Sequence, residues 1–340
     1  MIDSNPARMF LALLGIFAGA TGGAWAQDPR PNPCGEVLEQ VADVPMPGPA
    51  VRFDYQNMDA EHGRLYIAHM NADQLVVFDT AKRSVVGNLD GFKRVHGVIA
   101  VSEIDRVFAA ATGDHQVVSV DMQTLKIIGK AGPISYPDGL AYAPGARRVF
   151  VSDEHGAVDA VVDAETNRLI KNIPLGGFAG NTVYDPGSKR ILVAVHGVNQ
   201  LVEIDPASMA IVARHQLTGV ENPHGVALDV EGRLAFVAGE ENHALAVFDL
   251  RQSKELAVHQ VGDDPDVLAF DAGLKLLYVA AESGTVSVFR ETARDVQPLG
   301  HCSMPHAHSV SIDPKTHLVY FPLENLGGKP VLRIMRPAKP

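Results

Sequence analysis

The sequence is poor in cysteine, tryptophan and positive charge. Its 340 residues include two cysteines and one tryptophan. Two thiolates exclude a zinc ribbon, an iron–sulfur cluster or any other four-thiolate site, and disulfides cannot be the main source of stability. Asp and Glu number 40 against 29 Lys and Arg, a formal net charge of −11, which disfavours a uniformly basic surface for nucleic acid. A C-x-x-C-H haem motif and a G-x-S-x-G serine elbow are also missing.

Long hydrophobic runs are scarce, and the one of note lies near the start. A short apolar run over residues 9–18 follows Arg8, and small residues then lead to an A-x-A pattern ending at Ala26. This order is typical of a secretory signal peptide, and the run is too short to span a bilayer. We expect a signal peptide over residues 1–26, an extended leader over residues 27–35 and a periplasmic location. A short membrane anchor is the alternative.

The rest of the chain repeats one phrase seven times. Each copy reads as a polar residue, a short apolar strand, a turn, a second strand, a loop, a third strand ending in Asp and a fourth strand. Successive copies lie 42, 42, 42, 44, 42 and 42 residues apart. A period near this length with four strands per unit is typical of a β-propeller. The sequence therefore predicts an all-β fold, a seven-bladed β-propeller of four-stranded antiparallel blades, as one domain over residues 36–340.

The seventh copy ends before its fourth strand. The N-terminal segment 36–44 resembles the fourth strands of other copies, such as residues 168–175. We predict that residues 36–44 complete blade 7, which closes the ring and removes two exposed sheet edges. Cysteines of exported proteins usually pair. A disulfide between Cys34 and Cys302 is therefore expected, stapling the leader to the junction of blades 6 and 7.

Several stretches resemble the YVTN-type, YncE-like β-propeller proteins, whose repeats read P-x-G-V-A-V, R-L-Y-V-A-N and N-T-V-S-V-I-D. The matching stretches are Asn222–Leu228, Arg64–Ala68, Leu75–Asp79 and Leu277–Ala280. The resemblance covers residues 36–336 and implies the propeller fold, although such propellers have many functions. The Asn that usually ends the second strand is here mostly His, Asp or Glu.

Propeller topology places the loops between second and third strands, and between successive blades, on one face of the ring, which we call the mouth face. Ten of the 14 histidines fall there. The first polar residue of each copy should ring the mouth of the channel: Asp54, His96, Asp138, Gly180, His224, Asp266 and His308. A second ring follows the second strands: Met70, Thr112, Glu154, His196, Glu240, Glu282 and Glu324. The charged or metal-binding members of the two rings, Glu324 aside, are our candidate ligand-binding residues.

Converging imidazoles and carboxylates suit one divalent cation, although the pattern does not distinguish Ca, Zn and Cu. His224, Asp266 and His308, on successive blades, are the expected ligands. The alternative is a solvated mouth, because any channel mouth carries polar residues. The loop 301–308 offers sulfur and imidazole donors that would favour copper, and if Cys302 is paired, its His and Met donors are the ones that remain.

Other residues invite simpler interpretations. Aspartates that end the third strands are expected to cap turns; they are Asp79, Asp121, Asp163, Asp205 and Asp249. Aromatic residues near the mouth face could contact a ligand or pack between blades; they are Tyr55, Phe92, Tyr136 and Phe178.

Two functions stay open. The first is an exported, monomeric binding or scaffold protein whose mouth face meets a periplasmic protein, a glycan or a small ligand. The second is a metal-dependent enzyme with its ion at the mouth. For the latter, the chain resembles gluconolactonase/regucalcin-type and virginiamycin-lyase-type propellers, which implies lactonase-, hydrolase- or lyase-like chemistry. The sequence assigns no catalytic residue.

Overall fold

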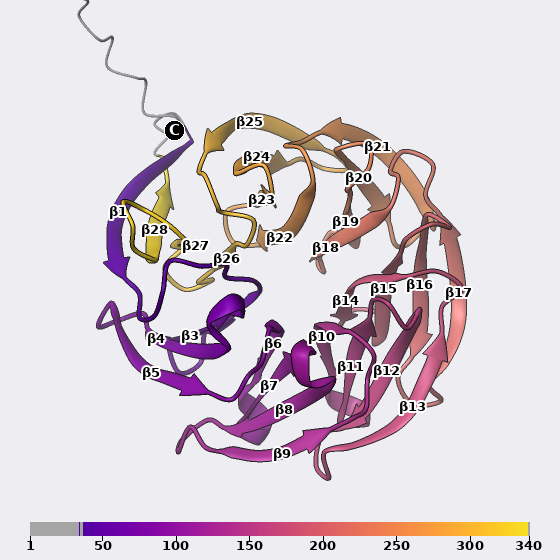
Figure 1. Cartoon of the computed structure of the whole chain (residues 1–340). Helices are drawn as coiled ribbons and strands as arrows, with labels where there is room; N and C mark the ends of the chain where they lie inside the picture. The colour runs from indigo at the N-terminus through magenta and orange to yellow at the C-terminus, as the bar shows by residue number, and fades with distance from the viewer. Residues whose placement is uncertain (1–33, 35–36, 339–340) are drawn as a thin grey trace, which may run out of the picture. The chain divides into compact units, whose positions relative to one another are not determined.

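The computed structural model describes residue 34 and residues 37–338. Seven antiparallel sheets of four strands each are arranged in a ring around a central channel (Figure 1). The prediction of a seven-bladed, all-β propeller is confirmed. We number the blades from the sheet that begins with β2.

Each blade runs outward from the channel. The innermost strands are β2 (Gln56–Asp59), β6 (Val95–Val101), β10 (Pro137–Ala143), β14 (Ala179–Asp185), β18 (Pro223–Asp229), β22 (Pro265–Asp271) and β26 (Ser311–Ile312). The second strands are β3 (Arg64–His69), β7 (Arg106–Ala111), β11 (Arg148–Asp153), β15 (Arg190–Val195), β19 (Leu234–Gly239), β23 (Leu276–Ala281) and β27 (Val319–Leu323).

The two outer layers of strands complete the blades. The third strands are β4 (Gln74–Asp79), β8 (Gln116–Asp121), β12 (Val158–Asp163), β16 (Gln200–Asp205), β20 (Ala244–Asp249), β24 (Thr285–Glu291) and β28 (Val331–Pro337). The outermost strands are β5 (Ser84–Asp90), β9 (Ile127–Ala131), β13 (Arg168–Pro174), β17 (Ala210–Gln216), β21 (Lys254–Gln260), β25 (Val296–Ser303) and β1 (Leu38–Pro45). Four short 3-10 helices lie in turns: η1 (Met70–Ala72), η2 (Ser102–Ile104), η3 (Thr112–Asp114) and η4 (Pro144–Ala146).

The core of the ring lies between the blades. Seven apolar clusters each join two adjacent blades. Middle strands such as β19 are buried along their whole length, because neighbouring blades cover both faces. Outermost strands such as β17 alternate exposed and partly buried residues, because one face meets water. The contrast explains why middle strands are continuous apolar runs in the sequence.

A glycine follows several of the polar residues that begin the innermost strands, because neighbouring blades come closest there. A Cβ on Gly97 would lie only 2.0 Å from the backbone oxygen of Asp138 in the next blade. Any larger residue would push blades 2 and 3 apart. This contact gives the glycine of the repeated motif a structural reason.

The aspartates that end the third strands cap turns, as predicted. Each accepts hydrogen bonds from backbone N–H groups two or three residues later, for example Asp121 from Thr124 at 2.7 Å. The same arrangement recurs at Asp79, Asp163, Asp205 and Asp249.

The ring is closed by strand β1, which pairs antiparallel with β28 from Leu38 opposite Pro337 to Pro45 opposite Val331. The side chain of Arg333 donates two hydrogen bonds to Asp43, of 2.8 and 2.7 Å. Figure 1 shows the first and last strands side by side in this blade. The predicted closure is confirmed, with the strand one or two residues later than expected.

The disulfide between Cys34 and Cys302 is also present. It links the residues just before β1 to β25, the outermost strand of blade 6. The predicted signal peptide and the leader, apart from Cys34, lie outside the described residues. Within residues 37–338, no helix has the length and apolar character needed to cross a membrane.

Candidate functional site

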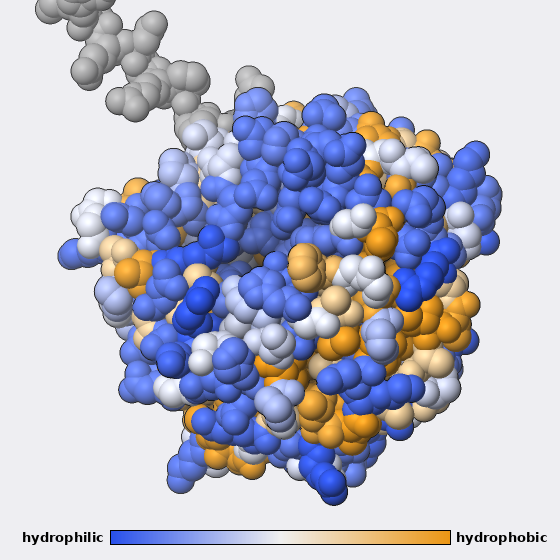
Figure 2. Space-filling view, turned by 45° about the vertical axis from the view of Figure 1, so that its right-hand side comes forward, coloured by the Kyte–Doolittle hydropathy of each residue, from blue (hydrophilic) through white to orange (hydrophobic). Residues whose placement is uncertain are grey.

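A pocket of about 260 Å³ lies where the channel opens on the mouth face. Seven carboxylates and one arginine line it, together with histidine and tyrosine. The lining residues are Arg52, Asp54, Tyr55, His96, Tyr136, Asp138, Glu154, His224, Glu240, Asp264, Asp266 and Glu282. Figure 2 shows hydrophilic residues over much of this face and apolar patches toward the rim at the right. The pocket is therefore suited to a cationic ligand.

The propeller topology explains why these residues meet. Each innermost strand begins at the mouth, and each second strand ends there, so equivalent positions of different blades converge. Eight of the ten candidate residues line the pocket. The other two touch its lining: His196 contacts His224, and His308 faces Asp54. The six His and Asp residues of the inner ring are all buried, each 7% exposed or less.

Tyr55 separates the pocket from the channel behind it. Its hydroxyl donates to Asp138 Oδ2 at 3.3 Å and lies 3.0 Å from His224 Nε2, so it reaches from blade 1 to blades 3 and 5. Burial and the charge of Asp138 hold the pKa of Tyr55 well above its usual value. The hydroxyl thus stays protonated as a hydrogen-bond donor. A space of about 430 Å³, lined mostly by apolar residues of the innermost strands, lies beyond it.

Three groups of side chains have the spacing of metal ligands. They are His196, His224 and Glu240; Asp54, Asp266 and His308; and Asp54, His96 and Asp138. The trio expected from the sequence is divided between two of them: His224 belongs to the first group, and Asp266 and His308 to the second. His224 Nε2 still lies 3.3 Å from Asp266 Oδ1.

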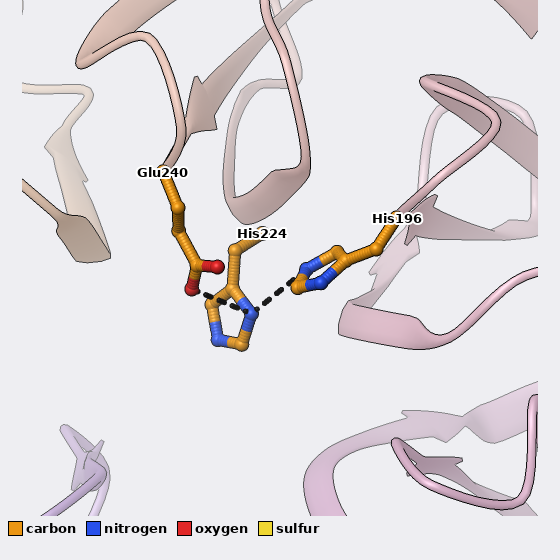
Figure 3. Close-up of side chains that lie close together, drawn as sticks. All are labelled: His196, His224 and Glu240. Atoms are coloured by element: carbon orange, nitrogen blue, oxygen red, sulfur yellow. Dashed lines mark hydrogen bonds and ion pairs between the residues drawn. The ribbon is translucent and has the colours of Figure 1, made fainter.

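The group around His224 is bonded within itself (Figure 3). His224 Nδ1 lies 3.2 Å from His196 Nε2 and 3.2 Å from Glu240 Oε1. Burial acts to lower the pKa of His224, but Asp266 and Glu240 raise it to about 10. Burial and the neighbouring charge of His224 lower the pKa of His196 to about 4. The three side chains of this group therefore already contact one another, with His224 between His196 and Glu240.

Two carboxyls of the pocket are poised near neutrality. Burial, with the charge of Asp54, raises the pKa of Asp138 to about 7 against the opposing effect of His96. Burial and nearby acids likewise raise the pKa of Glu240 to about 7, although His224 opposes them. Crowded carboxylates with too little compensating positive charge produce this effect.

Gly180, the one inner-ring position without a polar side chain, also has a structural reason. A Cβ on Gly180 would lie 2.8 Å from His224 Cα and 3.1 Å from His196 Nε2. The imidazole of His196, from the end of the second strand of the same blade, thus occupies the space where a side chain at position 180 would lie.

Sequence reasoning missed Arg52 and Asp264, which also line the pocket. Arg52 forms an ion pair with Glu282. Arg52, Tyr136 and Asp264 each lie two positions before an inner-ring residue, so they form a third ring. The same repeat period that located the inner ring would have located this third ring.

The remaining sequence candidates behave differently from one another. Phe92 is completely buried and packs in the core, whereas Phe178 is 55% exposed. The donors of loop 301–308 are not gathered at one point: Met304 is buried in the core between blades 6 and 7, and His306 pairs with Glu324. Cys302 is oxidised, so it offers no thiolate.

Comparison with known proteins supports the fold alone. No protein-family model matches the chain, and no curated protein matches it. Among solved structures, a chain of Kuenenia stuttgartiensis hydrazine synthase superposes with a TM-score of 0.70 over 94% of this chain and 99% of its own. The two sequences are 14% identical.

Proposed function

We propose that the protein is an exported binding propeller of the YVTN-like type that holds a divalent cation in the mouth pocket and presents it to a small ligand or a partner. The observation that carries the proposal is the buried inner ring, in which Asp and His alternate over five consecutive blades: Asp266, His308, Asp54, His96 and Asp138. Buried carboxylates are costly unless a cation compensates them. Mixed oxygen and imidazole ligands suit Mn²⁺, Zn²⁺ or related ions.

The disulfide and the acidic character of the protein support the rest of the proposal. Disulfides persist in oxidising compartments such as the periplasm. A net charge of −11 disfavours binding to nucleic acid, because such binding depends on neutralising phosphates with Lys and Arg.

Metal binding by the chelator-stripped protein tests this function. We expect equilibrium dialysis followed by elemental analysis to find at least one tightly bound equivalent of Mn²⁺ or Zn²⁺. The ion should also raise the melting temperature, since a ligand that binds only the native state stabilises it. His308→Ala should lower the bound amount, whereas His301→Ala, an exposed histidine on the outermost strand of blade 6, should not. Failure of Mn²⁺, Zn²⁺ and Ca²⁺ to bind would contradict the proposal.

A metal-dependent enzyme of lactonase-, hydrolase- or lyase-like type is the second candidate. The observation that favours it is the pair of tyrosine hydroxyls in the pocket, Tyr55 against Asp138 and Tyr136 against His96. Hydrolytic metal sites need proton donors beside the ion. Lactone hydrolysis that appears with the ion and disappears with a chelator would support this candidate. Equal rates of lactone hydrolysis with the ion and with a chelator would contradict this candidate and leave the binding function as the one proposed.

A further inference from the structure

Asp54 is the middle residue of the five alternating Asp and His residues of the inner ring. Its blade lies between blade 7, which supplies His308, and blade 2, which supplies His96. The two oxygens of this one carboxylate face opposite sides: Oδ1 lies 3.8 Å from His308 Nε2, and Oδ2 lies 3.8 Å from His96 Nε2. Asp54 is only 2% exposed, so the carboxylate is buried between the two histidines.

These separations are too long for hydrogen bonds, which span about 2.7–3.2 Å between nitrogen and oxygen. They match the spacing of two ligands on one ion. Ligand atoms bound about 2.1 Å from a metal lie roughly 3 to 4 Å apart. The facing pairs thus have room for a cation between them.

A second observation points to a ligand on the His308 side. His308 is 5% exposed, and its Nε2 has no hydrogen-bond partner within the described part of the chain. A buried polar nitrogen without a partner is costly. This nitrogen faces Asp54 Oδ1, and Asp266 completes a group whose three ligand atoms lie within 4.8 Å of one another.

The His96 side is oriented for the same purpose. His96 Nδ1 donates to the backbone oxygen of Arg94 at 2.7 Å, which leaves the lone pair of Nε2 directed into the pocket. A metal-binding histidine commonly makes this second hydrogen bond. Nε2 now accepts from the Tyr136 hydroxyl at 3.1 Å, a bond that an ion would replace. Asp138 completes the second group.

We propose that the mouth pocket is a two-cation site in which Asp54 bridges the ions, one held with His308 and Asp266 and the other with His96 and Asp138. This inference rests on the proposed function and specifies its stoichiometry and geometry. The group of His196, His224 and Glu240 lies outside the pair, because its members already bond to one another.

Titration of the chelator-stripped protein with Mn²⁺ alone tests the inference. We expect two equivalents in the wild-type protein and an electron paramagnetic resonance spectrum of a magnetically coupled pair. His96→Ala and His308→Ala should each retain one ion with the spectrum of isolated Mn²⁺. Asp54→Asn should weaken both sites by at least about 10-fold. His301→Ala and Asp114→Asn, which alter exposed residues outside the pocket, are the matched controls.

The possible outcomes separate the two proposals. One equivalent of isolated Mn²⁺ in the wild-type protein, or two equivalents that persist unchanged in Asp54→Asn, overturns the bridged pair and leaves the proposed function standing. No bound Mn²⁺, Zn²⁺ or Ca²⁺ overturns both. The coupled spectrum of the wild-type protein decides the matter even if a variant fails to fold.

Discussion

Among single residues, Asp159 is the least expected, because it is a carboxyl in the core. It lies on β12, is completely buried, and packs near Thr182 of the next blade. Burial raises the pKa of Asp159 to about 7, although Thr182 and the backbone of Val151 oppose the shift. A carboxyl with a raised pKa is bound to its proton more tightly in the folded protein than in the unfolded chain.

The sign of the resulting pH dependence follows directly. Between pH 4 and pH 7 the folded protein keeps a proton on Asp159 that the unfolded chain has lost, so stability falls as pH rises through this window. Above it, the ionised group costs up to about 4 kcal/mol. We therefore expect Asp159→Asn to be more stable than the wild-type protein at pH 8 and nearly equal to it at pH 4. Urea unfolding at the two pH values measures this, and an equal difference at both would contradict it.

Among the strands, β1 has the largest single effect on the ring. Without it, β28 would present an open edge, and edges of this kind promote aggregation. Leu38 of β1 is completely buried between blades 6 and 7. Removing residues 37–45 should therefore abolish cooperative melting or cause aggregation.

A graded form of the same prediction uses two leucines of outermost strands. Leu38→Ala should cost about 2–5 kcal/mol, because it opens a cavity in the core. Leu299→Ala, on β25, should change little, since Leu299 is 39% exposed. Thermal unfolding compares the two variants, and equal melting temperatures would argue against closure by β1 as a source of stability.

The strands were predictable from the sequence because each blade buries the same positions of its repeat. The inner ring followed for the same reason, and the period would also have located Asp264. The reach of Tyr55 across the channel was not predictable, since it depends on how wide the closed ring is. It was also not predictable that His224 and His308 belong to different groups of candidate metal ligands. That outcome depends on side-chain orientation, which periodicity does not determine.

At the scale of the whole molecule, the disulfide and β1 both act at the junction of blades 6 and 7, where the ring closes. Cys34 and Cys302 are 268 residues apart in sequence, so the bond encloses almost the entire ring. A cross-link over a long loop restricts the unfolded chain most strongly. The innermost strands, which form the pocket, lie at the opposite side of each blade from the strands that the disulfide joins.

These facts separate the stability of the ring from ligand binding at its mouth. The double variant Cys34→Ser, Cys302→Ser should lose about 2–5 kcal/mol of stability. It should still bind the same number of Mn²⁺ ions, because no pocket residue depends on the bond. Chemical unfolding of the variant, and of the wild-type protein with and without a reductant, measures the first effect, and dialysis measures the second. An unfolding midpoint that reduction leaves unchanged would mean that strand pairing alone joins β1 to the ring. Loss of the bound ions on reduction would mean that the pocket depends on the closure of the whole ring.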